Sequence, residues 1–415
     1  MRDINSARLL ERFLRYVRID TTAGEVGQGY PSSPGQLVLG RMLVDELREI
    51  GMSDAAQDEH GIILATLPGE GAPAAPTIAF NAHLDTSPET TGANVQPQVW
   101  RDYQGGDLVL PGDRSQIIRL ADNPELAQLV GRTIITSDGT TLLGADDKAG
   151  LAVIVEAVAW LAEHPEVKHA PVRVCFTCDE EIGHGVDHVD LQKLAATVCY
   201  TLDGSGADEI DVETFSADLA TVNVRGVNIH PSIANGRMVN AVRVAADFVS
   251  RLPAELLPER TDGRQGFLHP YQTTGGVASV SLKILLRDFE TPKLAEQANL
   301  LRTIAETTAA QWPGSEVAVT IEPQYRNMAD GLVREPRAVA YAEEAHRRLG
   351  RQARRTIIRG GTDGSRLTEL GLPTPNLSTG EHNPHSPLEW TCLEEMVAAV
   401  EVVATLAQVW GEEIS

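Results

Sequence analysis

The sequence predicts an α/β fold, with a mixed, mostly parallel sheet in one domain and a smaller α+β domain inserted into it. Short apolar runs alternate with amphipathic helices in the first two hundred residues, which is typical of strands covered by helices. The middle of the chain instead alternates apolar and polar residues in period two. A length of 415 residues is enough for two or three domains of about 100–200 residues each.

Two helices are expected at 6–19 and 35–50, where apolar residues recur every three to four positions. A long helix is expected from Lys148 to about Glu163, ended by Pro165. The segment 94–131 contains Gly- and Pro-rich turns and is expected to be an excursion with a hairpin. Apolar, β-branched runs predict strands at 62–67, 77–82, 132–136, 172–177 and 198–202.

The inserted domain is expected to span 214–327 and to divide the larger domain into 1–213 and 328–415. Its helices, at 239–252 and 292–312, either cover its sheet or mediate dimerisation. Its strands are expected at 218–227, 276–289 and 316–322. The last part should hold a helix at 335–349, a strand at 356–359 and a helix at 392–412, opened by a capping box between Thr391 and Glu394.

Composition excludes several classes of partner. The chain has 35 Lys+Arg against 58 Asp+Glu, a net charge of −23, so we expect no nucleic-acid or membrane partner, because both require a basic surface. Four cysteines are too few for a disulfide framework and indicate a reducing compartment. The N-terminal segment lacks the apolar core of a signal peptide, and no apolar run reaches the ~20 residues of a membrane span. We expect a cytoplasmic protein.

Acidic and histidine residues follow several of the predicted strands. In an open parallel sheet the carboxyl ends of the strands meet at one edge, where ligands bind. Carboxylates gathered there would repel one another unless a cation lay among them. A mixture of imidazole and carboxylate ligands favours zinc or a similar ion. The residues concerned are His83, Asp85, Asp146, Asp147, Asp179, Glu180, Glu181, Asp203, Glu381, His382 and His385.

The same segments resemble the metallopeptidases of the M20 clan. The motifs are HLDT at 83–86, TTLLGADDKAG at 140–150, DEEIGHG at 179–185, YTLDG at 200–204, GGTDG at 360–364 and HNPHSPLEW at 382–390. LLGADDKAG and GGTDG are similar to the tripeptide aminopeptidase branch of that clan. The resemblance covers nearly the whole chain and implies a catalytic domain with two zinc ions per subunit and an inserted lid domain.

The resemblance also implies a role for individual residues. Asp146 is preferred to Asp147 as the shared ligand, and His385 is preferred to His382. Glu180 would be the general base that activates a metal-bridging water, and Asp85 would orient His83. One zinc would be held by His83, Asp146 and Asp203, the other by Asp146, Glu181 and His385. His230 and Arg287 would bind the substrate.

The implied activity is removal of the N-terminal residue from short peptides, chiefly tripeptides. A dipeptidase, a carboxypeptidase, an N-acyl-amino-acid hydrolase and a non-catalytic metal-binding homologue are the alternatives. Ser232, the segment 233–237, Glu381 and Pro384 depart from the family pattern, which leaves specificity open. Some relatives dimerise through the lid, so a homodimer is also open.

Overall fold

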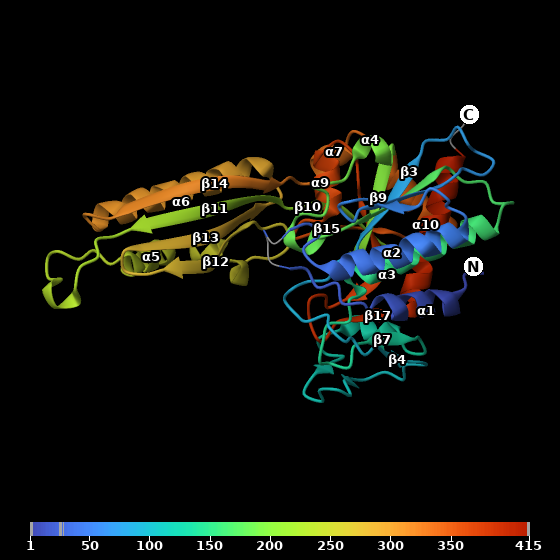
Figure 1. Cartoon of the computed structure of the whole chain (residues 1–415), viewed down its shortest axis with the longest axis horizontal. Coiled ribbons are helices and arrows are strands. Elements are labelled where there is room, and N and C mark those ends of the chain that lie inside the picture. Colours follow the sequence, from blue (N-terminus) through green and yellow to red (C-terminus); the bar gives the residue numbers. More distant parts are fainter. Residues whose placement is uncertain (1–2, 25–26, 28, 413–415) are drawn as a thin grey trace. The chain divides into compact units, whose positions relative to one another are not determined.

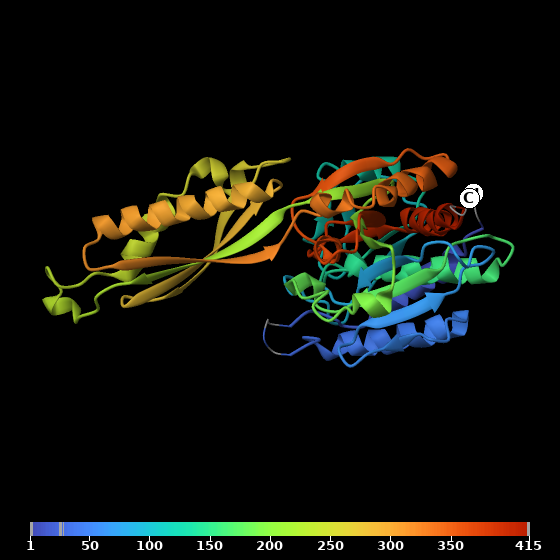
Figure 2. The ribbon, with the colours of Figure 1, turned by 90° about the horizontal axis from the view of Figure 1, so that it is seen from above.

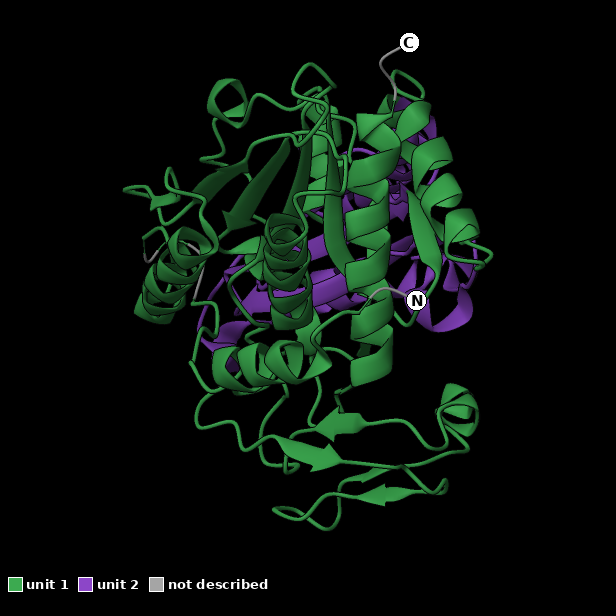
Figure 3. Ribbon diagram, turned by 90° about the vertical axis from the view of Figure 1, so that its right-hand side faces the viewer, with its two compact units in different colours: residues 1–212, 331–356, 362–415 green, residues 213–330, 357–361 purple. Residues whose placement is uncertain are grey.

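The computed structural model describes residues 3–24, 27 and 29–412. The chain divides into two compact units (Figure 3). Unit 1 comprises Met1–Val212, Gly331–Thr356 and Thr362–Ser415, and unit 2 comprises Glu213–Asp330 and Ile357–Gly361. Across the described residues, every helix is too short or too polar to cross a bilayer.

Unit 1 is built on a mixed sheet in the order β1-β2-β8-β3-β9-β16-β17-β7-β4. Its four central strands, β8 (Val172–Thr177), β3 (Ile78–His83), β9 (Val198–Ser205) and β16 (Asn376–His382), run parallel. The flanking strands β1 (Ala56–Gln57), β2 (Ile63–Leu67), β17 (Trp390–Cys392), β7 (Ile134–Thr136) and β4 (Gln98–Trp100) pair antiparallel. Off this path, β10 (Glu209–Thr214) pairs with β16 and with β15 (Arg354–Ile358). The predicted α/β fold class is confirmed.

The two faces of the central strands belong to different cores, because alternate residues of a strand point to opposite sides. Phe80, Val174 and Tyr200 lie in the larger core, whereas Ala79 and Cys199 lie in a smaller one. The larger core includes residues of α1 (Ser6–Tyr16), α2 (Pro34–Ile50), α3 (Ala145–Glu163), α8 (Arg337–Arg348) and α10 (Leu393–Gly411) (Figure 1). The smaller one includes residues of α4 (Leu191–Leu194) and α9 (Asp363–Glu369).

Helix α3 carries the start of the site and is the most enclosed helix of unit 1. Its residues from Ala145 to Leu161 are buried, since α1, α2 and α10 pack around it. Gly144, just before it, has a left-handed φ of 81°, and Asp146 and Asp147 depart from helical dihedral angles. The first turn of this helix therefore presents its carboxylates from an irregular backbone.

The expected hairpin in 94–131 is present: β5 (Leu108–Val109) pairs antiparallel with β6 (Ile117–Ile118). The expected capping box at α10 is wrong. Thr391 belongs to β17, where it is opposite Ile135, and the residue before the helix is Cys392, which makes no side-chain cap. Glu394 Oε2 accepts a hydrogen bond from Thr133 N at 2.9 Å instead.

Unit 2 has a four-stranded antiparallel sheet with its own core. The order is β12 (Phe267–Gly275), β13 (Ser279–Asp288), β11 (Ser216–Arg225) and β14 (Glu316–Tyr325). Helices α5 (Ala241–Ser250) and α6 (Thr291–Gln311) pack on each other and cover this sheet (Figure 2). The short helix α7 (Ala329–Leu332) follows β14. β12 was not expected, because it is mostly exposed and shows no apolar alternation.

Candidate metal centre

The site lies at the carboxyl edge of the central parallel strands. His83 is the last residue of β3, and Asp203 lies near the end of β9. β8 ends at Thr177 and leads into a short 3-10 turn, Glu180–Ile182. Because these strands are parallel, their ends meet at one edge, and the start of α3 adds Asp146 there.

Asp146 lies between two histidines, each facing a different oxygen of its carboxylate. His83 Nε2 lies 2.9 Å from Asp146 Oδ1, and His385 Nε2 lies 3.2 Å from Asp146 Oδ2. His385 Nε2 is also 3.0 Å from Glu181 Oε2, and His83 Nε2 is 3.9 Å from Asp203 Oδ1. The five predicted ligands therefore form one continuous chain of contacts, with Asp146 in the middle.

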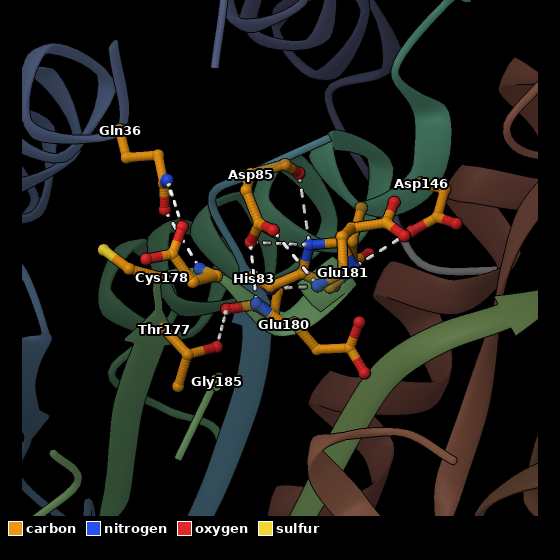
Figure 4. A network of polar contacts seen from close by, with 12 residues as sticks. Gln36, His83, Asp85, Asp146, Thr177, Cys178, Glu180, Glu181 and Gly185 are labelled. Carbon is orange, nitrogen blue, oxygen red and sulfur yellow. Dashed lines mark hydrogen bonds and ion pairs between the residues drawn. The ribbon is translucent and has the colours of Figure 1, made fainter. Parts of the chain in front are cut away.

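Asp85 fixes both His83 and the loop that carries Glu180 and Glu181 (Figure 4). His83 Nδ1 is hydrogen-bonded to the backbone oxygen of Asp85 at 3.1 Å and lies 3.4 Å from Asp85 Oδ1. Asp85 Oδ1 accepts a hydrogen bond from Glu180 N at 3.1 Å. Its Oδ2 accepts one from Glu181 N, also at 3.1 Å. A buried carboxylate with these partners orients the imidazole and the 3-10 turn together.

The residue before this turn, Asp179, has a left-handed φ of 63° and is held by α2 and the residues before that helix. Gln36 Nε2 donates to Asp179 Oδ1 at 2.6 Å, and Asp179 N donates to Gln36 Oε1 at 3.0 Å. Ser32 N donates to Asp179 Oδ2 at 2.6 Å. A non-glycine residue in this region is strained, so these bonds hold the backbone at the point where the chain turns toward Glu180.

Without a cation, the site is dominated by negative charge. Burial, followed by the charge of Asp146, raises the pKa of Glu181 to about 7 and the pKa of Asp203 well above its usual range. Burial also raises the pKa of Glu180 well above its usual range. Burial alone would lower the pKa of His385, but hydrogen bonds to Asp146 and Glu181 outweigh it and raise this pKa to about 11. Protons thus supply the positive charge that bound cations would replace.

The donor set fits metal ions by position as well as by charge. Ligand atoms within 4.8 Å of one another form three groups: His83, Asp146 and Glu181; His83, Asp147 and Asp203; and Asp146, Asp203 and Glu381. Glu181 Oε1 is buried and has no hydrogen-bond partner, as expected of an oxygen that binds an ion. Imidazole and carboxylate donors in overlapping groups suit two neighbouring divalent cations.

Asp147 and His382, to which Asp146 and His385 are preferred as ligands, have other partners, and so do the nearby His184 and His188. Asp147 accepts hydrogen bonds from His83 N and Gly150 N, both at 3.1 Å. His382 Nε2 lies 2.8 Å from Glu395 Oε2, and its ring stacks on Trp390. His184 Nδ1 lies 2.7 Å from Asp187 Oδ2, and His188 stacks on His60.

Two residues of the site had no role assigned from the sequence. Glu389 accepts hydrogen bonds from Leu143 N and Gly144 N at 2.7 Å and from Asp146 N at 3.0 Å. Glu381 lies in the group with Asp146 and Asp203. As noted above, Glu381 departs from the family pattern. This departure is the sequence signal that could have indicated a role for Glu381 in the site.

The two predicted substrate-binding residues lie in unit 2. His230 is exposed and precedes the 3-10 turn Pro231–Ile233, with its Nδ1 2.7 Å from Ser232 Oγ. Arg287 is buried in β13, donates to Asp218 O at 3.2 Å and lies over the Tyr325 ring. Their roles stay predictions.

Comparison with known proteins finds peptidases, both by a family model and by overall sequence identity. The model of peptidase family M20/M25/M40 matches residues 139–409. Peptidase T of Geobacillus thermodenitrificans (strain NG80-2) is 42% identical over 98% of this chain and 99% of its own. Peptidase T of Bacillus subtilis (strain 168) is 42% identical over 96% of this chain and 98% of its own.

Solved structures agree. The aminopeptidase PepT from Bacillus cereus ATCC 10987 is 25% identical, with a TM-score of 0.75, and covers 98% of this chain and 99% of its own. A tripeptidase from Staphylococcus aureus subsp. aureus mu50 is also 25% identical, with a TM-score of 0.79, and covers 99% of this chain and 100% of its own.

The histidines and carboxylates that converge at the carboxyl edge of the sheet, together with these relatives, identify a metal-dependent peptidase. The chain belongs to peptidase family M20/M25/M40, and the resemblance read from its motifs is confirmed.

Proposed function

We propose that this chain is a two-metal aminopeptidase that removes the N-terminal residue from tripeptides. The observation that carries the proposal is the division of the Asp146 carboxylate between His83 and His385, one on each oxygen. The similarity to proteins named Peptidase T and to a tripeptidase supports the choice of substrate.

We propose that His83, Asp146 and Asp203 hold one cation and that Asp146, Glu181 and His385 hold the other. When bound, two cations would supply the positive charge that lowers the pKa of a water molecule toward about 7 and polarises the scissile carbonyl. One imidazole with carboxylates at each position favours zinc over calcium or magnesium.

Glu180 would take the proton from the attacking water and deliver it to the leaving amine. The bond from Glu180 N to Asp85 Oδ1 holds its backbone beside the ligand Glu181. Burial raises the pKa of Glu180, and a raised pKa suits a group that must both accept and return a proton near neutral pH. His230 and Arg287 are proposed to contact the substrate, and Asp85 to orient His83.

The test combines metal analysis with hydrolysis of a tripeptide, its dipeptide fragment and its N-acetylated form. We expect two zinc ions per chain and cleavage of the free tripeptide alone. Cleavage of the acetylated peptide would favour an N-acyl-amino-acid hydrolase, and release of the C-terminal residue would favour a carboxypeptidase.

A Glu180→Gln variant should retain both ions and lose turnover. Undiminished hydrolysis by this variant would reject Glu180 as the base. Failure of the zinc-loaded protein to cleave any peptide would favour a non-catalytic homologue.

We also propose a cytoplasmic location. Cys175, Cys178, Cys199 and Cys392 are all buried and unpaired in the structure, as expected in a reducing compartment. Fractionation of cells that express the protein with an epitope tag should recover it with cytoplasmic markers, and recovery outside the cytoplasm would reject this location.

A further inference from the structure

Glu381 is a buried acid at the edge of the sheet where the site lies. It belongs to β16 and is 4% exposed. Gly380, just before it, has a φ of 89°, a left-handed conformation that favours glycine. Thr379 Oγ1 donates to Glu381 Oε2 at a long 3.3 Å. The next residue, His382, contacts Glu395 rather than the proposed metal ligands.

Carboxylate oxygens of Glu381, Asp146 and Asp203 lie within 4.8 Å of one another. Within the described part of the chain, no lysine or arginine forms an ion pair with any of these three carboxylates. The nearest side chain that can carry a positive charge beside these carboxylates is His83. Its Nε2 is 2.9 Å from Asp146 Oδ1 and 3.9 Å from Asp203 Oδ1. Buried carboxylates at such spacing need a cation, because their mutual repulsion is otherwise unscreened.

The two proposed metal positions differ in the acids around them. One has Asp146, Glu181 and His385 as its proposed protein ligands. The other has His83, Asp146 and Asp203, and Glu381 shares a group with these two aspartates, although not with His83. Zinc can expand to five ligands, so a fourth protein ligand at one position still leaves room for a bound water.

We propose that Glu381 is a fourth protein ligand of the divalent cation held by His83, Asp146 and Asp203, in addition to the water that both cations would share. The inference rests on the two-metal function proposed above and deepens it. The position with four protein ligands then binds its ion more tightly than the position that Glu181 and His385 complete.

The experiment measures zinc binding by the full-length protein after removal of metal. Competition with a chromophoric chelator gives the two affinities, and elemental analysis gives the number of ions. Glu381→Gln keeps the size of the side chain and removes its charge, whereas Glu381→Asp keeps the charge and withdraws the oxygens.

Asp211→Asn is the matched control. Asp211 is another buried acid of the same sheet, outside all three groups, and an asparagine there can still accept the hydrogen bond from Asn376 Nδ2. Thermal unfolding of each metal-free variant shows whether it folds.

We expect two ions of unequal affinity in the wild-type protein. Glu381→Gln and Glu381→Asp should each weaken the tighter ion by roughly 10- to 100-fold, the range seen when groups around a metal are removed, and leave the weaker ion unchanged. Asp211→Asn should bind both ions like the wild type.

Unchanged zinc affinities in Glu381→Gln would overturn the inference and leave the two-metal function standing. Loss of affinity in Glu381→Gln but not in Glu381→Asp would also overturn it, because charge rather than ligation would then be responsible. A wild-type protein that binds fewer than two ions would overturn the two-metal function and this inference together.

Discussion

Glu389 holds the backbone of Asp146 in place, although the two residues are far apart in the sequence. Glu389 Oε1 accepts a hydrogen bond from Asp146 N at 3.0 Å, and the carboxylate is 1% exposed. Its other oxygen accepts bonds from two further backbone N–H groups just before α3. This buried acid therefore satisfies donors at the start of the helix and sets the position of the residue proposed to be shared by both cations.

We predict that Glu389→Gln weakens metal binding and lowers kcat/KM by roughly 10- to 100-fold, as removal of groups that orient ligands does. The amide NH2 of glutamine would face N–H donors and leave at least one unsatisfied. Chelator competition and steady-state kinetics on a tripeptide measure both effects. Glu395→Gln is the control, because Glu395 contacts His382 rather than the ligands, and equal losses in the two variants would contradict this role for Glu389.

Gln36 should act on turnover through Asp179. Gln36→Ala removes two hydrogen bonds to Asp179 and frees the strained backbone ahead of Glu180, so kcat should fall roughly tenfold while metal content stays at two ions. Gln36→Glu should be equally damaging, because it puts a carboxylate against that of Asp179. Ser33→Ala, which removes only the 3.2 Å contact between Ser33 Oγ and Gln36 Nε2, should behave like the wild type. Loss of metal from Gln36→Ala would assign Gln36 to metal retention instead.

Gly150 should not tolerate a side chain, although alanine normally stabilises a helix. A Cβ on Gly150 would lie 2.1 Å from the backbone oxygen of Leu202 and 2.2 Å from Asp147 Oδ1. Gly150→Ala should therefore lower the free energy of unfolding by about 1–3 kcal/mol, the usual cost of overpacking.

Gly40→Ala in α2 is the comparison for this substitution. Its Cβ would meet the end of the flexible Gln57 side chain, which can move, so the change in stability should stay within about 1 kcal/mol. Urea unfolding of both variants measures the difference, and equal stabilities would show that the β9 backbone yields.

His169 and His346 should make the protein less stable in acid. Burial lowers the pKa of both imidazoles below the ordinary value near 6.5, and for His346 the charge of Arg351 adds to this while Asp208 opposes it. The unfolded chain then binds protons that the folded one does not. The stabilisation that the two neutral imidazoles give to the folded chain is complete above about pH 6.5. It is lost as the pH falls toward their lowered pKa values in the folded chain.

The free energy of unfolding of the metal-free wild type and of metal-free His346→Asn should be measured between pH 5 and pH 8, so that loss of metal does not contribute. The acids of the site, whose pKa values are raised, contribute equally to both proteins and cancel in the comparison. Toward the acid end the wild type should lose stability relative to His346→Asn, and an identical pH dependence in the two proteins would show that His346 titrates alike in the folded and unfolded chains.

The local pattern of residues was enough to predict the apolar strands of unit 1. The runs at 77–82, 172–177 and 198–202 become β3, β8 and β9, because a strand buried on both faces is usually apolar along its length. β16 escaped prediction because its sequence, NLSTGEH, is polar although it is entirely buried, its side chains being satisfied by neighbours at the site. Thr391 and Glu394 resemble a helix start, but pairing of β17 with β7 competes for that backbone and prevails.

The sequence by itself determined which residues could bind a cation, because histidines and acids that follow buried strands, together with the family motifs, identify His83, Asp146, Glu181, Asp203 and His385. Only the tertiary structure decided that Asp146 lies between two histidines, that Glu389 holds the backbone of Asp146 and that a carboxylate oxygen of Glu381 lies within 4.8 Å of one of Asp146. The physical reason is that distances between atoms far apart in the chain depend on the packing of the whole sheet, and no local pattern of residues contains that information.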